Sequence, residues 1–579
     1  MQIDLKKNLE SPKISACLSR EYDTCLPDNV CCYPVSPDIT NIADGIDHVL
    51  DSFNATFIHA PTGFGKTHFI LYEILPKVIQ DGGKILLASN RVAVSYQQKL
   101  ELMKMIDESE IGCLTPEGVI KKTDFGPVKI MTLQALDFFL ATPDGKKYAK
   151  EVSVLVLDEV HYFTSDVSFN PNSARLLKAI PRLFKDAIRI YMTATPEDIL
   201  RPLAEAEMNA VRPMVERIGT RLSPLVFGQP PVINLYQFKS DKYKYLPVRY
   251  FKGDEELYQR IRDNKNDKWL IFVSSKENGK SMQKELGKDA VFISADSKGS
   301  DTWNQLLSEE HFSSQVMITT SVLDCGVNIH DDSLKHVVIP FEDRVSFMQA
   351  LGRVRFKGRP NFTLYVKALS KQRLNGLVQK NCELLSLAKE IQTHTYNNSF
   401  VDRFRQENDI AKGALLYLDY KGSYTFNDLY YHKLRQQKTY YNQLARFIDQ
   451  DGEYDESTFP HIVHQWLGQS DAYDEQNWLG HNMIQKSKQD LLTFLESYKG
   501  RCLNSESEQK SFGETLYQFY KNITGSKKRD DRGDGYLKTA ALNNCLKEMQ
   551  IGGEINSSGK GGGWRFNMEA DGGETDTFL

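Results

Sequence analysis

One short segment, Ala60–Thr67 with the sequence APTGFGKT, constrains this chain more than any other. It follows the apolar run 55–59 and precedes a stretch with helical spacing, so the sequence predicts a strand, a glycine-containing loop and the start of a helix. The loop ends in Gly65, Lys66 and Thr67, as in the phosphate-binding pattern G-x-x-x-x-G-K-[ST], although an alanine replaces the first glycine. In such loops backbone N–H groups point at phosphate oxygens, the lysine reaches the β- and γ-phosphates, and the threonine hydroxyl can bind Mg²⁺. We therefore expect a nucleotide site here, although the tripeptide alone would also suit a plain turn.

The composition is that of a folded protein without a strong charge bias. The chain has 579 residues, which suggests three or four domains. The net charge of −4 gives no global basic field for nucleic acid, so any such surface would be local. No apolar run approaches the roughly 18 residues of a membrane span, and the N-terminus lacks the apolar segment of a signal peptide, which favours an intracellular, cytoplasmic protein. The clustered cysteines are not spaced as a zinc site, which favours reduced thiols at Cys17, Cys25, Cys31 and Cys32.

Short apolar runs alternate with helical patterns between residues 45 and 205. Runs of this kind suit strands buried on both faces of a parallel sheet, in which ligands sit at the carboxyl ends of the strands. Every candidate chemical residue of this unit falls at such an end. The predicted strands are 55–59, 84–88, 128–132, 152–157 and 188–193.

Two carboxylates follow the fourth of these strands. Asp158 stands where a phosphate-loop enzyme holds Mg²⁺, and Glu159 beside it can deprotonate an attacking water. An acidic turn at the end of a strand is the structural alternative. The fifth strand ends in Thr193 and Thr195 before a proline, which by itself reads as a turn.

In their order and spacing, the segments APTGFGKT, DEVH and MTATP resemble the first half of a superfamily 2 helicase motor of the DExH kind. The resemblance implies two tandem RecA-like parallel-sheet domains with ATP and Mg²⁺ in the cleft between them. It implies nucleotide contacts from Thr62, Gly63, Gly65, Lys66, Thr67 and Asp158, with Mg²⁺ on Thr67 and Asp158. It implies that three residues couple the ATP site to the nucleic acid, namely His161, Thr193 and Thr195. Loops after the second and third strands resemble loops that touch the nucleic-acid backbone in that family, which implies such contacts from Arg91, Thr132 and Gln134.

A second α/β unit is predicted over residues 230–375, after a linker at 206–229. Its strands would be 269–275, 290–294, 315–319, 335–339 and 362–367. It has no phosphate loop of its own, so it would complete the first site from across a cleft.

Two stretches of this second unit, 319–329 and 349–355, resemble the fifth and sixth motifs of the same family. They imply nucleotide contacts from Gly326 and Asn328, a nucleic-acid contact from Thr320, and catalytic roles for Gln349, Arg353 and Arg355. The resemblance also implies a nucleic-acid contact from Ser274, at the hydroxyl-rich end of the predicted strand 269–275. Phosphoryl transfer needs positive charge on the developing γ-phosphate, and an arginine from a mobile second domain can supply it. The second arginine of the family would fall at Phe356, so Arg353 is the first candidate for this role and Arg355 the second.

The segments around the two units carry weaker patterns. Residues 1–44 are predicted to be irregular. The stretch 230–239, with the alternating Lys and Tyr of 242–245, suits either an edge strand or part of a nucleic-acid track, because rings stack on bases and lysines pair with phosphates.

The C-terminal third begins with a predicted helical accessory domain, 376–525. Its stretch 409–450 is rich in tyrosine and basic residues, which suits either nucleic-acid contacts or a helix bundle with a solvated basic face. Residues 526–568 read as a helix followed by a hairpin and resemble a small winged-helix unit. The acidic, glycine-rich tail 569–579 is predicted to be disordered.

The resemblance covers about residues 50–370 and implies a nucleic-acid-stimulated ATPase, either a helicase or a translocase. DNA is favoured over RNA by the winged-helix pattern and by the DExH signature. One alternative is a motor of a restriction, defence or mobile-element system that translocates DNA without separating strands. Another is a nucleic-acid-binding module with a non-hydrolysing ATPase fold, against which Lys66 and Glu159 argue. A small-molecule kinase would leave 349–355 without a role.

Overall fold

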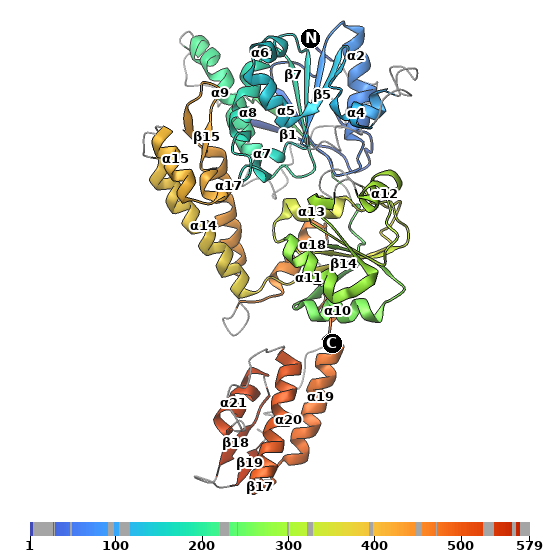
Figure 1. Ribbon diagram of the computed structural model, residues 1–579, viewed down its shortest axis with the longest axis vertical. Coiled ribbons are helices and arrows are strands. Elements are labelled where there is room, and N and C mark those ends of the chain that lie inside the picture. Colours follow the sequence, from blue (N-terminus) through green and yellow to red (C-terminus); the bar gives the residue numbers. More distant parts are fainter. Residues whose placement is uncertain are drawn as a thin grey trace. The chain divides into compact units, whose positions relative to one another are not determined.

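The computed structural model shown in Figure 1 describes residues 1–3, 27, 29–46, 49–90, 98–103, 116–219, 231–239, 241–297, 300–320, 328–392, 398–446, 454–469, 472–524, 538–549, 551–557 and 563–567. These residues form two compact units. One comprises Met1–Val248 and Ile261–Tyr473, and the other Arg249–Arg260 and Asp474–Leu579. Within the described ranges no helix combines the length and apolarity needed to cross a bilayer.

An eight-stranded sheet lies at the centre of what we call the first lobe. Its strand order is β1-β8-β2-β7-β6-β3-β5-β4, and every pair is parallel except β4–β5. The strands are β1 (Val30–Pro34), β2 (Ala55–His59), β3 (Ile85–Ser89), β4 (Asp124–Phe125), β5 (Val128–Thr132), β6 (Val154–Asp158), β7 (Ile188–Thr193) and β8 (Ile233–Gln237). The five strands predicted for this region are confirmed as β2, β3, β5, β6 and β7.

Successive residues of these strands enter two different hydrophobic clusters, one on each face of the sheet. In β2, Ala55 and Phe57 belong to one cluster and Ile58 to the other. Burial on both faces explains why the strands are continuous apolar runs. The helical segments of this lobe are η1 (Ile42–Gly45), α1 (Lys66–His68), η2 (Phe69–Ile74), α2 (Leu75–Gln80), α4 (Pro116–Lys121), α5 (Leu133–Ala141), α6 (Pro143–Ala149), α7 (Tyr162–Ser165), α8 (Ser173–Leu183) and α9 (Leu200–Gly219).

Two strands of this sheet differ from the sequence-based expectation. The N-terminal segment, expected to be irregular, supplies β1, in which Cys31 and Cys32 are free thiols. The stretch 230–239, expected to be an edge strand or part of a nucleic-acid track in the second unit, supplies β8, which lies between β1 and β2. Ile233 of β8 pairs with both Val30 and Ala55. Both strands are short and pair only with partners distant in the sequence, so local patterns could not place them. Cys17 and Cys25 lie outside the described residues.

A second parallel sheet forms what we call the second lobe. Within this unit its strands run in the order β11-β12-β10-β13-β14. They are β10 (Lys268–Phe272), β11 (Ala290–Ile293), β12 (Val316–Thr319), β13 (Leu334–Ile339) and β14 (Thr363–Lys367), which confirms the five predicted strands. The helices are α11 (Lys276–Leu286), η4 (Gly287–Asp289), η5 (Ala295–Ser297), α12 (Asp301–Glu309) and α13 (Arg344–Gly352).

Helices that follow the second sheet complete this unit. They are α14 (Lys371–Gln392), α15 (Asn398–Glu407), α16 (Ile410–Gly413), α17 (Asp428–Leu444) and α18 (Thr458–Trp466). Helices α14 and α17 lie side by side (Figure 1). The stretch between α16 and α17, predicted to be helical, is an antiparallel hairpin of β15 (Leu416–Leu418) and β16 (Tyr424–Phe426). Gly422 in its turn has φ +80°, a conformation that ends a helix and favours a tight turn.

The accessory helices share their core with the first lobe. Leu384, Leu416 and Leu434 belong to the same buried cluster as Leu133 and Leu176 of the first lobe. Polar contacts reinforce this packing, since Tyr420 donates a hydrogen bond to Asp137, which also accepts from Arg175. These elements are therefore an extension of the first lobe.

The other unit contains a compact arrangement of helices and a small sheet. Its elements are β9 (Val248–Phe251), α10 (Asp254–Asp263), η7 (Glu475–Asn477), α19 (His481–Tyr498), β17 (Cys502–Leu503), α20 (Glu506–Thr524), α21 (Thr539–Glu548), β18 (Glu554–Ser557) and β19 (Trp564–Asn567). The three-stranded sheet has the order β17-β19-β18 and is antiparallel. Helix, strand, two helices and a hairpin thus follow one another, as in a winged-helix-like unit (Figure 1).

This winged-helix-like unit is larger than the predicted 526–568. Leu491 of α19 and Phe512 of α20 share one buried cluster with Leu546 and Phe566. The stretch 527–535 is charged and rich in glycine, which is typical of a linker between domains. The elements on either side of it nevertheless pack in the same core.

Candidate nucleotide site and nucleic-acid interface

The phosphate loop lies at the carboxyl end of β2 and leads directly into α1. Gly63 and Gly65 have φ of +84° and +83°, which lets the loop curl without the strain a side chain would bring. The ammonium group of Lys66 folds back over the loop and donates a hydrogen bond to the Ala60 carbonyl at 3.0 Å. A loop of this shape, with its lysine poised inside it, fits the phosphates of a nucleotide.

Asp158 and Glu159 lie at the end of β6 as predicted. Asp158 is 4% exposed, and its carboxylate accepts hydrogen bonds from the Glu159 N–H at 3.0 Å and from the Gln98 side chain at 3.2 Å. Burial, together with the neighbouring Glu159 charge, raises the pKa of Asp158. Burial acts in the same sense on Glu159, but Lys66, a hydrogen bond from His161 and the charge of Arg353 outweigh it and lower the pKa of Glu159. Glu159 is therefore the carboxylate that stays ionised.

The backbone of Glu159 is in the left-handed region, with φ +56°. This conformation is unfavourable for a residue with a side chain and is typical of active sites that hold a group in place. It is fixed on both sides, because the Glu159 N–H bonds the Asp158 carboxylate and the Val160 N–H donates to Met192 O at 3.1 Å. The turn therefore ties the end of β6 to the end of β7.

His161 joins the carboxylates to β7. Its Nδ1 lies 3.3 Å from Glu159 Oε2 and 3.0 Å from Thr193 Oγ1. The Thr193 hydroxyl also accepts a hydrogen bond from the Thr195 N–H at 3.1 Å. The three residues predicted to couple the ATP site to the nucleic acid thus form one continuous chain that starts at Glu159.

Arg355 of the second lobe lies against the phosphate loop of the first. A Cβ atom added to Gly63 would come within 2.8 Å of its Nη1, and its Nε donates to Asn328 Oδ1 at 3.0 Å. Arg353 lies near the two carboxylates, since its charge lowers the pKa of both Asp158 and Glu159. The structure therefore brings both candidate arginines to the site.

The backbone around Val354 explains how both Arg353 and Arg355 can face the site. Ile329 N–H donates to Arg353 O at 2.8 Å, and Arg355 N–H donates to Ile329 O at 2.9 Å. Val354 between them is 3% exposed and fills the core, so its two neighbours face away from it. Phe356, which stands where the family has its second arginine, packs instead against the rings of Tyr243 and Phe362.

Further contacts join the two lobes at this cleft. A Cβ atom on Gly352, at the end of α13, would lie 2.9 Å from Thr62 Oγ1 of the phosphate loop. Arg344, at the start of the same helix, forms an ion pair of 2.8 Å with Glu197 of the first lobe. Gln349 on this helix has a buried side-chain nitrogen with no hydrogen-bond partner among the described residues. Helix α13 therefore meets the first lobe at both of its ends.

The predicted nucleic-acid residues are spread over the carboxyl ends of both sheets. Thr132 ends β5 and caps α5, since its hydroxyl accepts from the Ala135 N–H at 3.1 Å, and Gln134 is exposed in the first turn of α5. Ser274 and Thr320 follow β10 and β12. Arg91 and Gly326 lie outside the described residues. Thr67 lies in α1 beside Lys66.

Some residues of the site escaped the sequence analysis. Gln98 bonds Asp158 from 60 positions upstream, and no local pattern marks it. Glu197 could have been noticed, because it directly follows the MTATP segment, but its pairing with Arg344 across the cleft is visible only in the structure.

Comparison with known proteins identifies part of the chain. Residues 42–202 match the family model described as DEAD/DEAH box helicase. The matched segment covers most of the first lobe and confirms the predicted resemblance to superfamily 2 helicases. The two parallel α/β sheets agree with the predicted pair of tandem RecA-like domains.

Two curated relatives match the helicase region. The chain is 24% identical over 300 residues to the competence protein ComFA of Streptococcus pneumoniae, covering 51% of this chain and 63% of the relative. It is 27% identical over 257 residues to DEAD-box ATP-dependent RNA helicase 57 of Oryza sativa subsp. japonica, covering 42% and 43%. The chain thus spans less than two thirds of the length of either relative.

Solved helicase structures are similar at low identity. S. cerevisiae Dbp5 bound to RNA and ADP BeF3 is 16% identical with a TM-score of 0.37, covering 56% of this chain and 82% of that one. The DUF1998 helicase MrfA bound to DNA and AMPPNP is 15% identical with a TM-score of 0.38, covering 65% and 58%. The family assignment rests on the matched segment 42–202.

Proposed function

We propose that the protein is an ATP-dependent helicase or translocase that moves along nucleic acid, with DNA as its substrate. One observation carries the proposal: Arg355 of the second lobe lies against Gly63 of the phosphate loop in the first. A site built from two lobes can hydrolyse ATP only when they meet, so hydrolysis is tied to their movement.

In the proposed mechanism each side chain has one task. The N–H groups of the loop and Lys66 bind the β- and γ-phosphates, which replace the loop carbonyls as partners of the lysine. Thr67 and Asp158 would hold Mg²⁺, which neutralises charge on the phosphates when it is bound. Glu159 accepts the proton of the attacking water.

The arginines supply the charge that the transition state needs. Arg355, held by Asn328, and Arg353 place positive charge beside the γ-phosphate as it is transferred. The chain from Glu159 through His161 to Thr193 would pass a change at the γ-phosphate to the end of β7. Thr132, Gln134, Ser274 and Thr320 would contact the strand at the carboxyl ends of the sheets, so that closing and reopening moves it.

The winged-helix-like unit supports the preference for DNA, because helix-turn-helix variants place a helix in the major groove of a duplex. The major groove of double-stranded RNA is too narrow for this mode.

The test measures ATP hydrolysis by the purified protein alone and with single-stranded DNA, duplex DNA or RNA. We expect stimulation by DNA. Glu159→Gln should lower the stimulated rate by about 100-fold or more while ATP binding persists. A strand-displacement assay separates unwinding from translocation alone. If no nucleic acid stimulates the wild type, the proposal is wrong, and unchanged hydrolysis by Glu159→Gln would exclude Glu159 as the base.

A further inference from the structure

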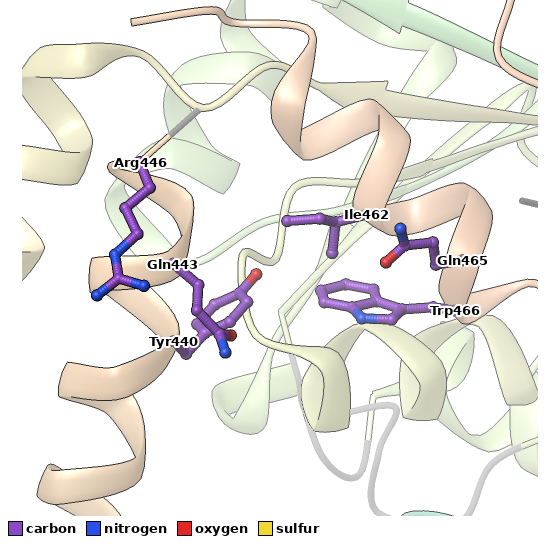
Figure 2. Close-up of a pocket in the computed structure, with 6 residues that line it drawn as sticks. All are labelled: Tyr440, Gln443, Arg446, Ile462, Gln465 and Trp466. Carbon is purple, nitrogen blue, oxygen red and sulfur yellow. The ribbon is translucent and has the colours of Figure 1, made fainter. Parts of the chain in front are cut away.

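A cavity of about 480 Å³ lies between α17 and α18, outside the ATP site (Figure 2). It is lined by Tyr440 and Gln443 from α17, by Arg446 just after the end of that helix, and by Ile462, Gln465 and Trp466 from α18. Figure 2 shows the Tyr440 and Trp466 rings bordering the space between the two helices, with Arg446 at its outer edge. Among the described residues that line the cavity none is a carboxylate and one, Arg446, is a cation, so this part of the lining suits a neutral or anionic ligand.

The two rings are held rigidly by their surroundings. Tyr440 donates a hydrogen bond from its hydroxyl to Glu342 O at 2.8 Å. Trp466 packs edge-on against Phe347, with ring centroids 5.4 Å apart, and against Phe459 at 5.8 Å. A fixed aromatic surface beside an open space is a platform on which a planar base can stack, and stacking accepts any base.

The polar lining matches the rest of a nucleotide. The Gln443 and Gln465 side chains are exposed, and each amide offers both donors and an acceptor, as the edges of bases require. Arg446 carries a planar guanidinium suited to a phosphate. Ring, amides and cation together fit one nucleotide.

A row of cations on α17 leads to this cavity. Arg435 and Lys438 lie three residues apart on α17, so they share one side of the helix, and Arg446 follows two residues after its end; all three are exposed. None of the three has an ion-pair partner within the described ranges. Such a row can follow several phosphates of a strand, and a free nucleotide would use only one of its cations.

The cavity is also connected to the catalytic cleft. Phe347, against which Trp466 packs, lies on α13, and Glu342, which holds Tyr440, precedes that helix. Helix α13 ends at Gly352, beside the phosphate loop and directly before Arg353. A ligand stacked on Trp466 is therefore connected through Phe347 to α13, the helix that directly precedes Arg353.

We propose that this cavity binds one nucleotide of a single strand, its base stacked on Trp466 and the neighbouring phosphates on the α17 cations. The inference rests on the proposed function, because it takes the motor's own nucleic acid as the ligand. A free nucleotide presents the same chemistry and is the alternative source.

The test compares binding of labelled dT12 with binding of a 12-mer of the same backbone that lacks all bases. The variant Gln443→Ala/Gln465→Ala keeps both rings, and Trp466→Leu removes the platform. The matched control is Gln392→Ala/Gln406→Ala, two exposed glutamines on α14 and α15. We expect both cavity variants to bind dT12 about 10-fold more weakly, to bind the abasic strand like the wild type, and to hydrolyse ATP normally without a strand.

Binding of dTMP is measured with the same variants, and two outcomes bear on the cavity. Unchanged dT12 and dTMP binding by both cavity variants would overturn the site. Loss of dTMP binding with unchanged dT12 binding would keep the site but assign it to a free nucleotide. Stimulation of wild-type hydrolysis by saturating dT12 is recorded in parallel, and because it tests the motor separately, its failure is distinguishable from failure of the cavity.

Discussion

Asp158 and Glu159 are neighbours in the chain, yet their surroundings move their pKa values in opposite directions. Burial and the adjacent charge raise the pKa of Asp158, whereas Lys66, His161 and Arg353 lower that of Glu159. Such a separation assigns different roles to two carboxylates. The residues themselves could be predicted from the order of the motifs, because the chemistry fixes their types. The bond from Gln98 could not, because it depends on a contact across 60 positions.

Removing the Thr193 hydroxyl should reduce stimulation by nucleic acid more than it reduces ATP hydrolysis itself. Thr193→Val keeps the shape but removes the bonds to His161 and to the Thr195 N–H. We expect unstimulated ATP hydrolysis to stay within about threefold of wild type, and stimulation by nucleic acid to fall about tenfold. Thr195→Val is the matched control, because the Thr195 hydroxyl has no hydrogen-bond partner among the described residues. Equal stimulation of the Thr193 variant and the wild type would contradict the coupling role.

At the scale of elements, α13 is the part of the second lobe that reaches the ATP site. Most strands could be predicted from the sequence, because burial on both faces leaves apolar runs. Strands β1 and β8 could not be placed, since only their register with distant strands defines them. The approach of Gly352 to Thr62 was equally invisible, because it is a contact between lobes.

Gly352→Ala tests that approach. The added Cβ would lie 2.9 Å from Thr62 Oγ1 and 3.2 Å from its Cβ, so the end of α13 must move away from the phosphate loop. We expect ATP binding within about threefold of wild type and hydrolysis reduced about tenfold or more, since small displacements of catalytic groups are costly. Gly376→Ala on α14 is the control, because nothing lies within 4 Å of its added Cβ. Equal hydrolysis by the two variants would show that the lobes need not approach this closely.

Helix α17 carries a pH-sensitive group. Burial, then the charges of Arg201 and Arg435, lower the pKa of His432 from 6.5 to about 4. The unfolded chain therefore binds more protons between these values, so the stability held above pH 6.5 is lost as the pH falls towards 4. Because glutamine does not titrate, the free energy of unfolding of His432→Gln should fall by about 1–2 kcal/mol less than that of the wild type when the pH is lowered from 7 to 5. The measurement is the thermal midpoint of both proteins from pH 7 to pH 5, and curves that fall in parallel would contradict the assignment.

At the scale of the whole molecule, the described residues build separate cores. The first lobe and the accessory helices share one, which contains Leu416, whereas α19, α20, α21 and the small sheet share another, which contains Leu495. The sequence predicted an accessory domain of helices but could not show which lobe it would join. That depends on contacts such as Arg175 Nη1 to Leu418 O, 243 positions apart.

Matched core truncations test this division. Leu416→Ala should destabilise the first lobe by about 3 kcal/mol and lower the thermal transition that an ATP analogue raises. Leu495→Ala removes an equally buried side chain from the other core and should leave that transition unchanged. If Leu416→Ala spares the nucleotide-stabilised transition, the accessory helices are not part of the first lobe.

In the proposed mechanism the second lobe completes the ATP site and so ties hydrolysis to nucleic acid. The most direct measurement is the rate of ATP hydrolysis at saturating single-stranded DNA for the wild type and for Arg355→Ala. We predict stimulation of the wild type and a stimulated rate about 1,000-fold lower in the variant, with ATP binding retained. A variant that keeps the stimulated rate would contradict the composite site.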